Sequence, residues 1–212
     1  MGHEKFAEAD GSLTVHLGLG MLRISVPLCI LFLLSSASAQ NNLVKNPSAE
    51  EGLKFWRVFG NASASDCLGV GKCFSVNQDA FVFQDIDVPE STAGRFALFI
   101  SFAAIEKSYS PKTMGQPCLH GYFMTSGDLR KAILLANLSG QEMTHRPNAN
   151  GEWVKEFGVF LVPERTGRIR IFMRSGCGKT EPSSNCTSHF RNAGVFLFET
   201  EDEAKAFVAS YQ

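Results

Sequence analysis

Residues 96–104 read Phe-Ala-Leu-Phe-Ile-Ser-Phe-Ala-Ala, a run that is apolar except for Ser101 and has no charged side chain. Alternate positions of this run carry large apolar side chains, namely Phe96, Leu98, Ile100 and Phe102. Successive side chains of a strand point to opposite faces, so this period of two predicts a β-strand with one apolar face. The run therefore points to a sheet packed against another layer.

A second segment repeats the pattern. In residues 168–174, arginines alternate with Ile169, Ile171 and Met173. Further apolar runs separated by Gly, Pro and Asn turns predict strands at the spacing of a β-sandwich: 42–44, 80–88, 121–124, 132–138, 153–162 and 194–198. Two antiparallel sheets packed through such faces account for the 18 phenylalanines of the chain.

The last segment predicts the one helix. Thr200 followed three residues later by Glu203 forms a capping box, and Ala204, Phe207, Val208 and Tyr211 then share one face. We expect this helix to dock on the sandwich. The predicted fold class is all-β, a β-sandwich of two antiparallel sheets with a short C-terminal helix.

The beginning of the chain predicts export. Residues 21–39 combine Arg23, a short apolar run and small residues before Gln40, which is the pattern of a secretory signal peptide. Residues 1–20 are acidic and are interpreted as an upstream extension, with Met21 as the start and residues 40–212 as the domain. The alternative is a real extension followed by an uncleaved anchor, but the run is short of the roughly 20 residues that span a bilayer. We expect a secreted protein without a membrane anchor, extracellular or, in a bacterium, periplasmic.

The net charge limits the classes of binding partner that we expect. The chain has 20 Lys and Arg against 21 Asp and Glu, and removal of residues 1–39 takes away two basic and three acidic residues, which leaves the domain neutral. Nucleic acids and anionic membranes are bound through clustered basic residues, so neither is expected as a partner. An uncharged ligand or a protein fits better.

The cysteines predict disulfides, because export places them in an oxidising compartment. We expect the pairs Cys67–Cys73 and Cys177–Cys186, each closing a short loop, with Cys118 left over; the sequence alone leaves other pairings open. The spacings do not favour a zinc site. Asn61, Asn137 and Asn185 begin N-glycosylation sequons, which are relevant only in a eukaryote.

The segment 42–56, Asn-Leu-Val-Lys-Asn-Pro-Ser-Ala-Glu-Glu-Gly-Leu-Lys-Phe-Trp, resembles the opening of galactose-binding-like jelly rolls, a group that includes many secreted carbohydrate-binding modules. It is also similar to the start of the glycan-binding F-box-associated domains, which share that fold. Weaker similarities at 83–88, 153–163 and 193–197 follow in the expected order. The resemblance implies a jelly roll with carbohydrate as the first-choice ligand.

The resemblance also implies a structural calcium ion near Glu50 and Glu51. The last strand carries Asn192 near the place where such modules have an Asp, so one anionic ligand is missing and Asn192 would have to compensate. No other cofactor is expected.

The candidate sugar-binding residues are Tyr109, Tyr122, His120 and Trp153, because aromatic rings stack on pyranose faces while polar groups meet the hydroxyls. The resemblance places Trp153, like Trp56, at a position that favours packing in the core over ligand binding. No pattern of a catalytic nucleophile or metal centre is present, so we expect no enzyme. The rival to a carbohydrate-binding module is an extracellular structural or protein-binding adhesion domain that lacks a sugar site.

Overall fold

In the computed structural model, the described residues form ten strands and one α-helix. The structure describes residues 40–67, 69–77, 79–105, 118–128, 131–138, 151–175 and 187–212. The strands are β1 (Arg57–Phe59), β2 (Ala62–Asp66), β3 (Lys72–Asn77), β4 (Phe81–Asp87), β5 (Phe96–Ile105), β6 (Cys118–Met124), β7 (Leu134–Leu138), β8 (Val154–Leu161), β9 (Arg168–Arg174) and β10 (Thr187–Phe198). A 3-10 turn, η1 (Glu90–Thr92), lies between β4 and β5, and helix α1 (Glu201–Ser210) ends the chain.

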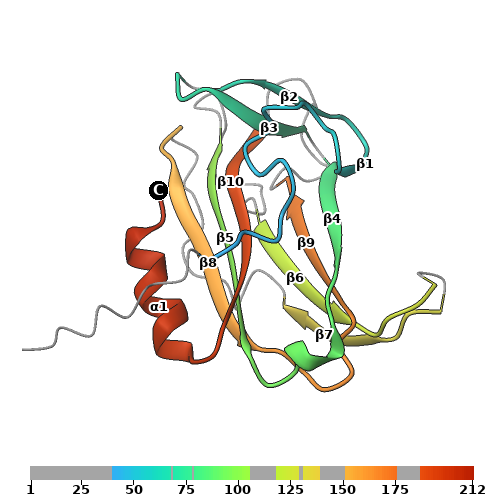
Figure 1. The fold of residues 1–212 in the computed structure, drawn as a ribbon. Helices are drawn as coiled ribbons and strands as arrows, with labels where there is room; N and C mark the ends of the chain where they lie inside the picture. Colours follow the sequence, from blue (N-terminus) through green and yellow to red (C-terminus); the bar gives the residue numbers. More distant parts are fainter. Residues whose placement is uncertain are drawn as a thin grey trace, which may run out of the picture. The chain divides into compact units, whose positions relative to one another are not determined.

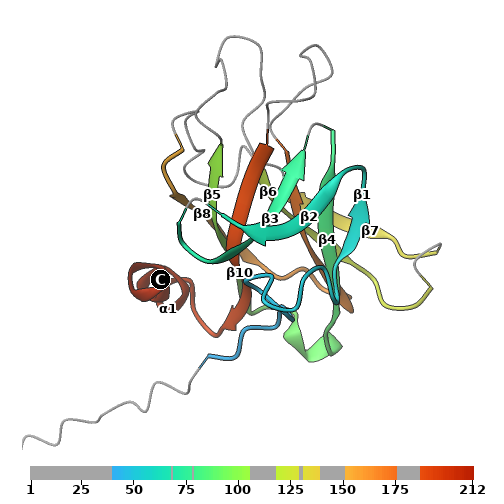
Figure 2. The same ribbon diagram turned by 90° about the horizontal axis from the view of Figure 1, so that it is seen from above.

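The strands form two five-stranded sheets, in the orders β1-β4-β9-β6-β7 and β2-β3-β10-β5-β8. Every neighbouring pair is antiparallel, and sequence neighbours such as β4 and β5 lie in different sheets. Figures 1 and 2 show the two sheets face to face, with α1 outside the β10-β5-β8 side and away from β4. This arrangement confirms the predicted all-β sandwich with a short C-terminal helix.

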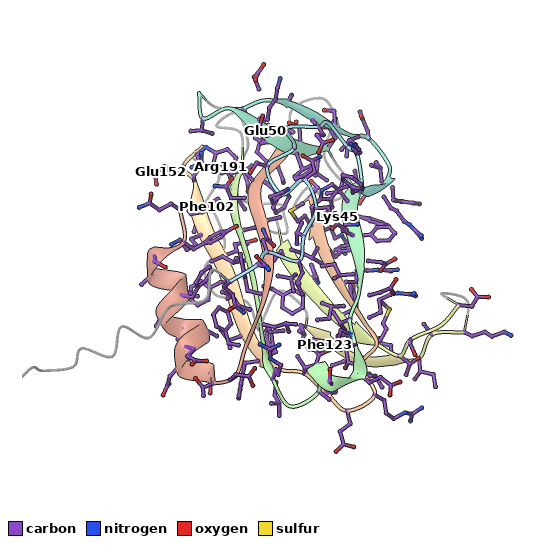
Figure 3. The ribbon with its side chains drawn as sticks, in the orientation of Figure 1. Lys45, Glu50, Phe102, Phe123, Glu152 and Arg191 are labelled. Atoms are coloured by element: carbon purple, nitrogen blue, oxygen red, sulfur yellow. A yellow bond between two sulfur atoms is a disulfide. The ribbon has the colours of Figure 1, made fainter. Side chains whose placement is uncertain are left out.

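The core between the sheets uses one face of each central strand. Ile169, Ile171 and Met173 of β9 are all buried there, as the alternation in residues 168–174 predicted. Phe123 of β6 lies in the same core, with its ring centroid 5.8 Å from that of Phe99 (Figure 3). Gly121 permits this approach, because a Cβ at that position would lie 2.7 Å from the Phe99 ring.

Strand β5 is buried on both faces, and this corrects the sequence prediction for its orientation. The residues between the two sheets are Ala97, Phe99 and Ala103, whereas Leu98 and Ile100 belong to a second cluster with Phe196 and Phe198 of β10. The alternating face chosen from the sequence is therefore the outer one. A strand that is buried on both sides has no polar face to mark the direction of the core.

Helix α1 covers that outer face. Ala204 and Val208 are buried in the second cluster, and Phe207 and Tyr211 pack against it, so the predicted helix face is confirmed. The Thr200 side chain accepts a hydrogen bond from the Glu203 amide and the Glu203 side chain accepts one from the Thr200 amide, which confirms the capping box.

The region before β4 differs from the sequence prediction. Residues 42–44 are not a strand; they are held to β10 by a bond from the Leu43 amide to the Val195 carbonyl and by the Asn42 side chain. Strands β1, β2 and β3 were not predicted, because β1 is three residues long and β2 reads Ala-Ser-Ala-Ser-Asp with little apolar alternation. Trp56 is buried beside Phe74, in the core role that the resemblance implied.

Candidate functional site

The outer face of the sheet β1-β4-β9-β6-β7 gathers aromatic side chains from four strands. Its strand register places Phe59 opposite Phe81, Phe83 opposite Phe172, and Phe172 opposite His120. Because residues paired across strands share a face, these side chains line one side of the sheet while Val82, Ile171 and Phe123 fill the core on the other. We call the set Phe59, Phe81, Phe83, Phe172, His120 and Tyr122 the aromatic face.

The rings of the aromatic face contact one another. Phe81 lies between Phe59 and Phe172, with centroid distances of 4.7 and 4.6 Å and small interplanar angles. His120 and Tyr122 meet the same Phe172 ring edge-on, at 5.5 and 6.0 Å. Phe59 is 59% exposed at the end of the stack, and the other rings are half-buried. The result is a contiguous platform of rings that is partly open to solvent.

A fixed charged pair borders the platform. Arg170 donates two hydrogen bonds to the Asp85 carboxylate, from Nε at 2.6 Å and from Nη2 at 3.0 Å, and its guanidinium carbon lies 4.3 Å from the Phe83 ring centroid. Arg57 approaches Asp85 from the edge strand, at 4.0 Å. The Asp85 side chain is only 12% exposed and that of Arg170 24%, so the bidentate pair holds both groups in one orientation.

The structure brings two of the four predicted sugar-binding residues together. Tyr122 and His120 are two positions apart on β6 and both contact Phe172. Trp153 precedes β8 in the other sheet and is not part of this face. Tyr109 lies outside the described residues.

Trp153 belongs to a separate cluster on the helix side. The guanidinium carbon of Arg191 lies 4.9 Å from the Trp153 ring and 5.4 Å from the Phe102 ring, and Phe102 stacks on Tyr211 at 6.3 Å. Figure 3 shows Arg191 and Phe102 side by side beyond the C-terminal end of α1. Lys155 donates hydrogen bonds to the carbonyls of Val208 and Tyr211, so this cluster holds the end of the helix in place.

The residues predicted to hold calcium have other partners or face solvent. Glu51 pairs with Lys54, Glu50 is exposed, and the Asn192 side-chain oxygen accepts a hydrogen bond from Ser48 at 2.7 Å. A calcium ion needs six to eight oxygen ligands, so binding here would require these contacts to rearrange. Calcium binding at these residues therefore stays a prediction.

The predicted disulfide Cys67–Cys73 is present and closes the β2–β3 hairpin. The predicted partners Cys177 and Cys186 lie outside the described residues. Asn61 and Asn137 are exposed, whereas Asn185 also lies outside the described part of the chain. No described helix is long and apolar enough to cross a membrane.

Sequence reasoning missed the phenylalanines of the aromatic face. In β4, Phe81 and Phe83 stand on either side of Val82, and the two phenylalanines face outward while Val82 is buried. The signal lay in the pairing of β4 with β9, where Phe172 stands among the outward-facing arginines. Neither strand alone reveals that the rings meet.

Comparisons with known proteins bear on the fold. No protein-family model matches the chain, and no curated protein sequence matches it. Among solved structures, the chain is similar to the enzymatically active domain of tailspike protein 4 of bacteriophage CBA120, at 16% identity and a TM-score of 0.52. That match covers 74% of this chain and 21% of the tailspike chain.

The fold is also similar to that of the tandem CBM22-1–CBM22-2 domain of Xyn10C from Paenibacillus barcinonensis, at 11% identity and a TM-score of 0.50, over 78% of this chain and 48% of that chain. The single CBM22-1 xylan-binding domain of the same enzyme gives 10% identity and a TM-score of 0.49, over 77% of this chain and 99% of that one. At such identities the likeness to the tailspike domain and the tandem domain shows the fold alone, a jelly-roll β-sandwich.

Proposed function

We propose that this protein is a secreted, non-catalytic carbohydrate-binding module that binds its glycan on the aromatic face. The observation that carries the proposal is the Phe59–Phe81–Phe172 stack beside the bidentate Arg170–Asp85 pair on one open side of the sheet. The fold likeness to a tandem of carbohydrate-binding modules supports the same reading.

The chemistry of the face suits a neutral sugar chain. Pyranose rings present C–H groups on their faces, which pack on exposed aromatic rings such as Phe59, and hydroxyls at their edges, which need planar polar partners. A guanidinium has five N–H donors, of which Arg170 uses two on Asp85, so donors remain for sugar hydroxyls. Tyr122 adds a hydroxyl at the far side of the stack. A row of rings across several strands fits an extended chain of sugars better than a single residue.

The carboxylates of this face support binding rather than hydrolysis. Glycoside hydrolysis uses two carboxyl groups, one of which must donate a proton. Asp85 is held by Arg170, and Asp87, two positions along β4, accepts a hydrogen bond from Arg168 at 2.8 Å. Each of these carboxylates is thus engaged by an arginine rather than free to meet a glycosidic oxygen. The face is therefore proposed to bind sugar chains without cleaving them.

Binding of the purified protein to a panel of soluble β-linked oligosaccharides and polysaccharides, measured by calorimetry, tests the proposal. Phe59→Ala removes the most exposed ring of the stack, and we expect affinity to fall by about tenfold, the equivalent of about 1.4 kcal/mol. Leu161→Ala is the matched control, because Leu161 is similarly exposed, at 57%, but lies on β8 of the other sheet.

The outcomes separate the proposed function from its rival. Binding that is weakened by Phe59→Ala and unchanged by Leu161→Ala supports a sugar site on this face. Equal loss in both variants would place the ligand elsewhere, and no binding to any glycan by the folded protein would favour the protein-binding adhesion domain. Each titration is repeated with added calcium and with a chelator, and an affinity or melting temperature that rises with calcium would support the proposed ion near Glu50 and Glu51.

A further inference from the structure

The disulfide Cys67–Cys73 is packed against a histidine and a serine from two neighbouring strands. His189 of β10 places Nδ1 3.3 Å from the Cys67 sulfur and 3.5 Å from the Cys73 sulfur. Ser75 of β3 places its hydroxyl 3.1 Å from the same Nδ1, 3.4 Å from the Cys67 sulfur and 3.8 Å from the Cys73 sulfur. Among the described residues, Cys67, Cys73 and His189 are the one set of three ligand-type side chains whose ligand atoms lie within 4.8 Å of one another.

These separations resemble the edges of a tetrahedral metal site. Zinc binds thiolate sulfur at about 2.3 Å and histidine nitrogen at about 2.0 Å, so ligand atoms around one zinc ion lie about 3.5 Å apart. The two sulfur–nitrogen distances already have this value, and Ser75 Oγ stands near the fourth corner. Only the two sulfur atoms, while bonded to each other, are too close. Opening the disulfide would complete the geometry with little movement of the strands.

We propose that, with the disulfide reduced, Cys67, Cys73 and His189 form a binding site for zinc or a similar soft divalent cation, so that disulfide and metal are alternative states of the same hairpin. The Ser75 hydroxyl, or a water beside it, takes the fourth position. Two thiolates and an imidazole are a ligand set that selects zinc over calcium or magnesium. This site is independent of the aromatic face, which belongs to the other sheet.

The exchange between the two states balances. A dithiol reductant gives two electrons and two protons to the Cys67–Cys73 bond and becomes a disulfide itself, leaving two protein thiols. Each thiol releases its proton when its sulfur binds the cation, because the thiolate is the ligand. Reoxidation by a disulfide reverses the step and expels the metal.

The position of the hairpin allows a reagent to reach buried sulfur atoms. Cys73 is fully buried and Cys67 nearly so, but β2 is the edge strand of its sheet and the connecting residues Gly69, Val70 and Gly71 are exposed. Local opening of an edge hairpin costs less free energy than opening of a central strand. His189, by contrast, is held on β10 between β3 and β5, so one ligand stays fixed while the hairpin moves.

The test compares zinc binding by the reduced and oxidised protein. The protein is reduced with a dithiol, desalted without oxygen, and titrated with zinc against a coloured chelator. We expect one more zinc ion per chain in the reduced state than in the oxidised one. His189→Gln keeps every cysteine, so it is the matched variant. Its affinity for zinc should fall by more than about tenfold, because even the loss of a residue that only hydrogen-bonds to a metal ligand costs about tenfold or more.

Two further measurements decide the result. The double variant Cys67→Ser/Cys73→Ser should lose the additional zinc ion, and the X-ray absorption spectrum of the zinc-loaded reduced wild type should show two sulfur ligands with nitrogen or oxygen completing the shell. The spectrum needs no variant, so it decides the matter even where His189→Gln fails to fold. Equal zinc binding by reduced and oxidised protein, or unchanged binding in the double variant, would overturn the proposal.

Discussion

Both outer faces of this sandwich carry aromatic rings, but they present them in opposite ways. On the sheet β2-β3-β10-β5-β8, the rings of Phe196 and Phe198 are buried under helix α1 together with aliphatic side chains. On the sheet β1-β4-β9-β6-β7, Phe81 and Phe172 are half-buried among arginines and acids, and no described helix covers them.

The difference shows how one fold separates stability from binding. Apolar side chains without polar neighbours need a cover, and α1 supplies it with Ala204 and Val208. Rings that alternate with ion pairs tolerate water, so they can remain available to a ligand. We therefore expect substitutions on the covered face to change stability and substitutions on the aromatic face to change binding.

The largest effect is expected for Phe196→Ala on the covered face. Phe196 is 3% exposed and contacts Phe207 and Tyr211 of the helical segment, at centroid distances of 4.7 and 5.5 Å. Truncation of a buried phenylalanine costs about 3–5 kcal/mol. Urea unfolding followed by circular dichroism measures the loss. Any glycan affinity of the folded variant should stay unchanged, since the aromatic face lies on the other sheet.

The matched substitution on the open face is Phe59→Ala, whose free energy of unfolding should fall by about 1 kcal/mol or less. Phe59 is largely exposed and its ring stacks on that of Phe81, and such aromatic pairs contribute about 0.5–1.5 kcal/mol. A loss as large as that of Phe196→Ala would show that the aromatic face is a structural core and would break the comparison.

The sequence predicted the strands on both sides of this contrast, but not always which face of a strand points into the core between the sheets. The period of two in residues 168–174 predicted the core side of β9 correctly, because arginine marks the solvent side. In β5 both sides are apolar, so the same method assigned the side under the helix to the core between the sheets. Only the position of α1 resolves the ambiguity, and that is a contact between segments about 100 residues apart in the chain.

The binding face was harder to predict than the fold. Tyr122 and His120 were selected because aromatic rings stack on pyranose faces and polar groups meet the hydroxyls, but the platform they join is built from phenylalanines of β1, β4 and β9. The rings form a platform only because of the register in which the strands pair, and that register could not be predicted from the sequence. Similarly, the Cys67–Cys73 pair was predicted from its short loop, whereas the contact with His189 depends on the pairing of β10 with β3.

A smaller effect is expected at the start of the covering helix. Thr200→Ala removes the side chain that accepts a hydrogen bond from the Glu203 amide, at 3.2 Å. Loss of an N-cap threonine costs about 1 kcal/mol. The free energy of unfolding should fall by that amount while the sheets persist, and Thr200→Ser, which keeps the hydroxyl, should restore most of it. Equal losses in the two variants would mean that the cap contributes nothing to holding α1 on the sheet.

The smallest effect is expected on stability at alkaline pH, and it is specific to Tyr211 of the covered face. Burial raises the pKa of Tyr211 from 10.0 to about 12, and its hydroxyl donates a hydrogen bond to the Asn192 carbonyl at 2.8 Å. Because the folded state keeps this proton after the unfolded chain has released it, the contribution of Tyr211 to stability is complete below pH 10 and declines as pH rises from about 10 to 12.

Tyr211→Phe removes the titrating group. Its melting temperature should start lower, because the hydrogen bond is lost, and should fall less steeply across that pH range than that of the wild type. Tyr122→Phe, on the aromatic face, is the control for tyrosine loss as such. If the melting temperatures of the wild type and Tyr211→Phe fall equally steeply between pH 9 and 12, the Tyr211 hydroxyl is not buried. The covered face would then be more open to solvent than in the structure.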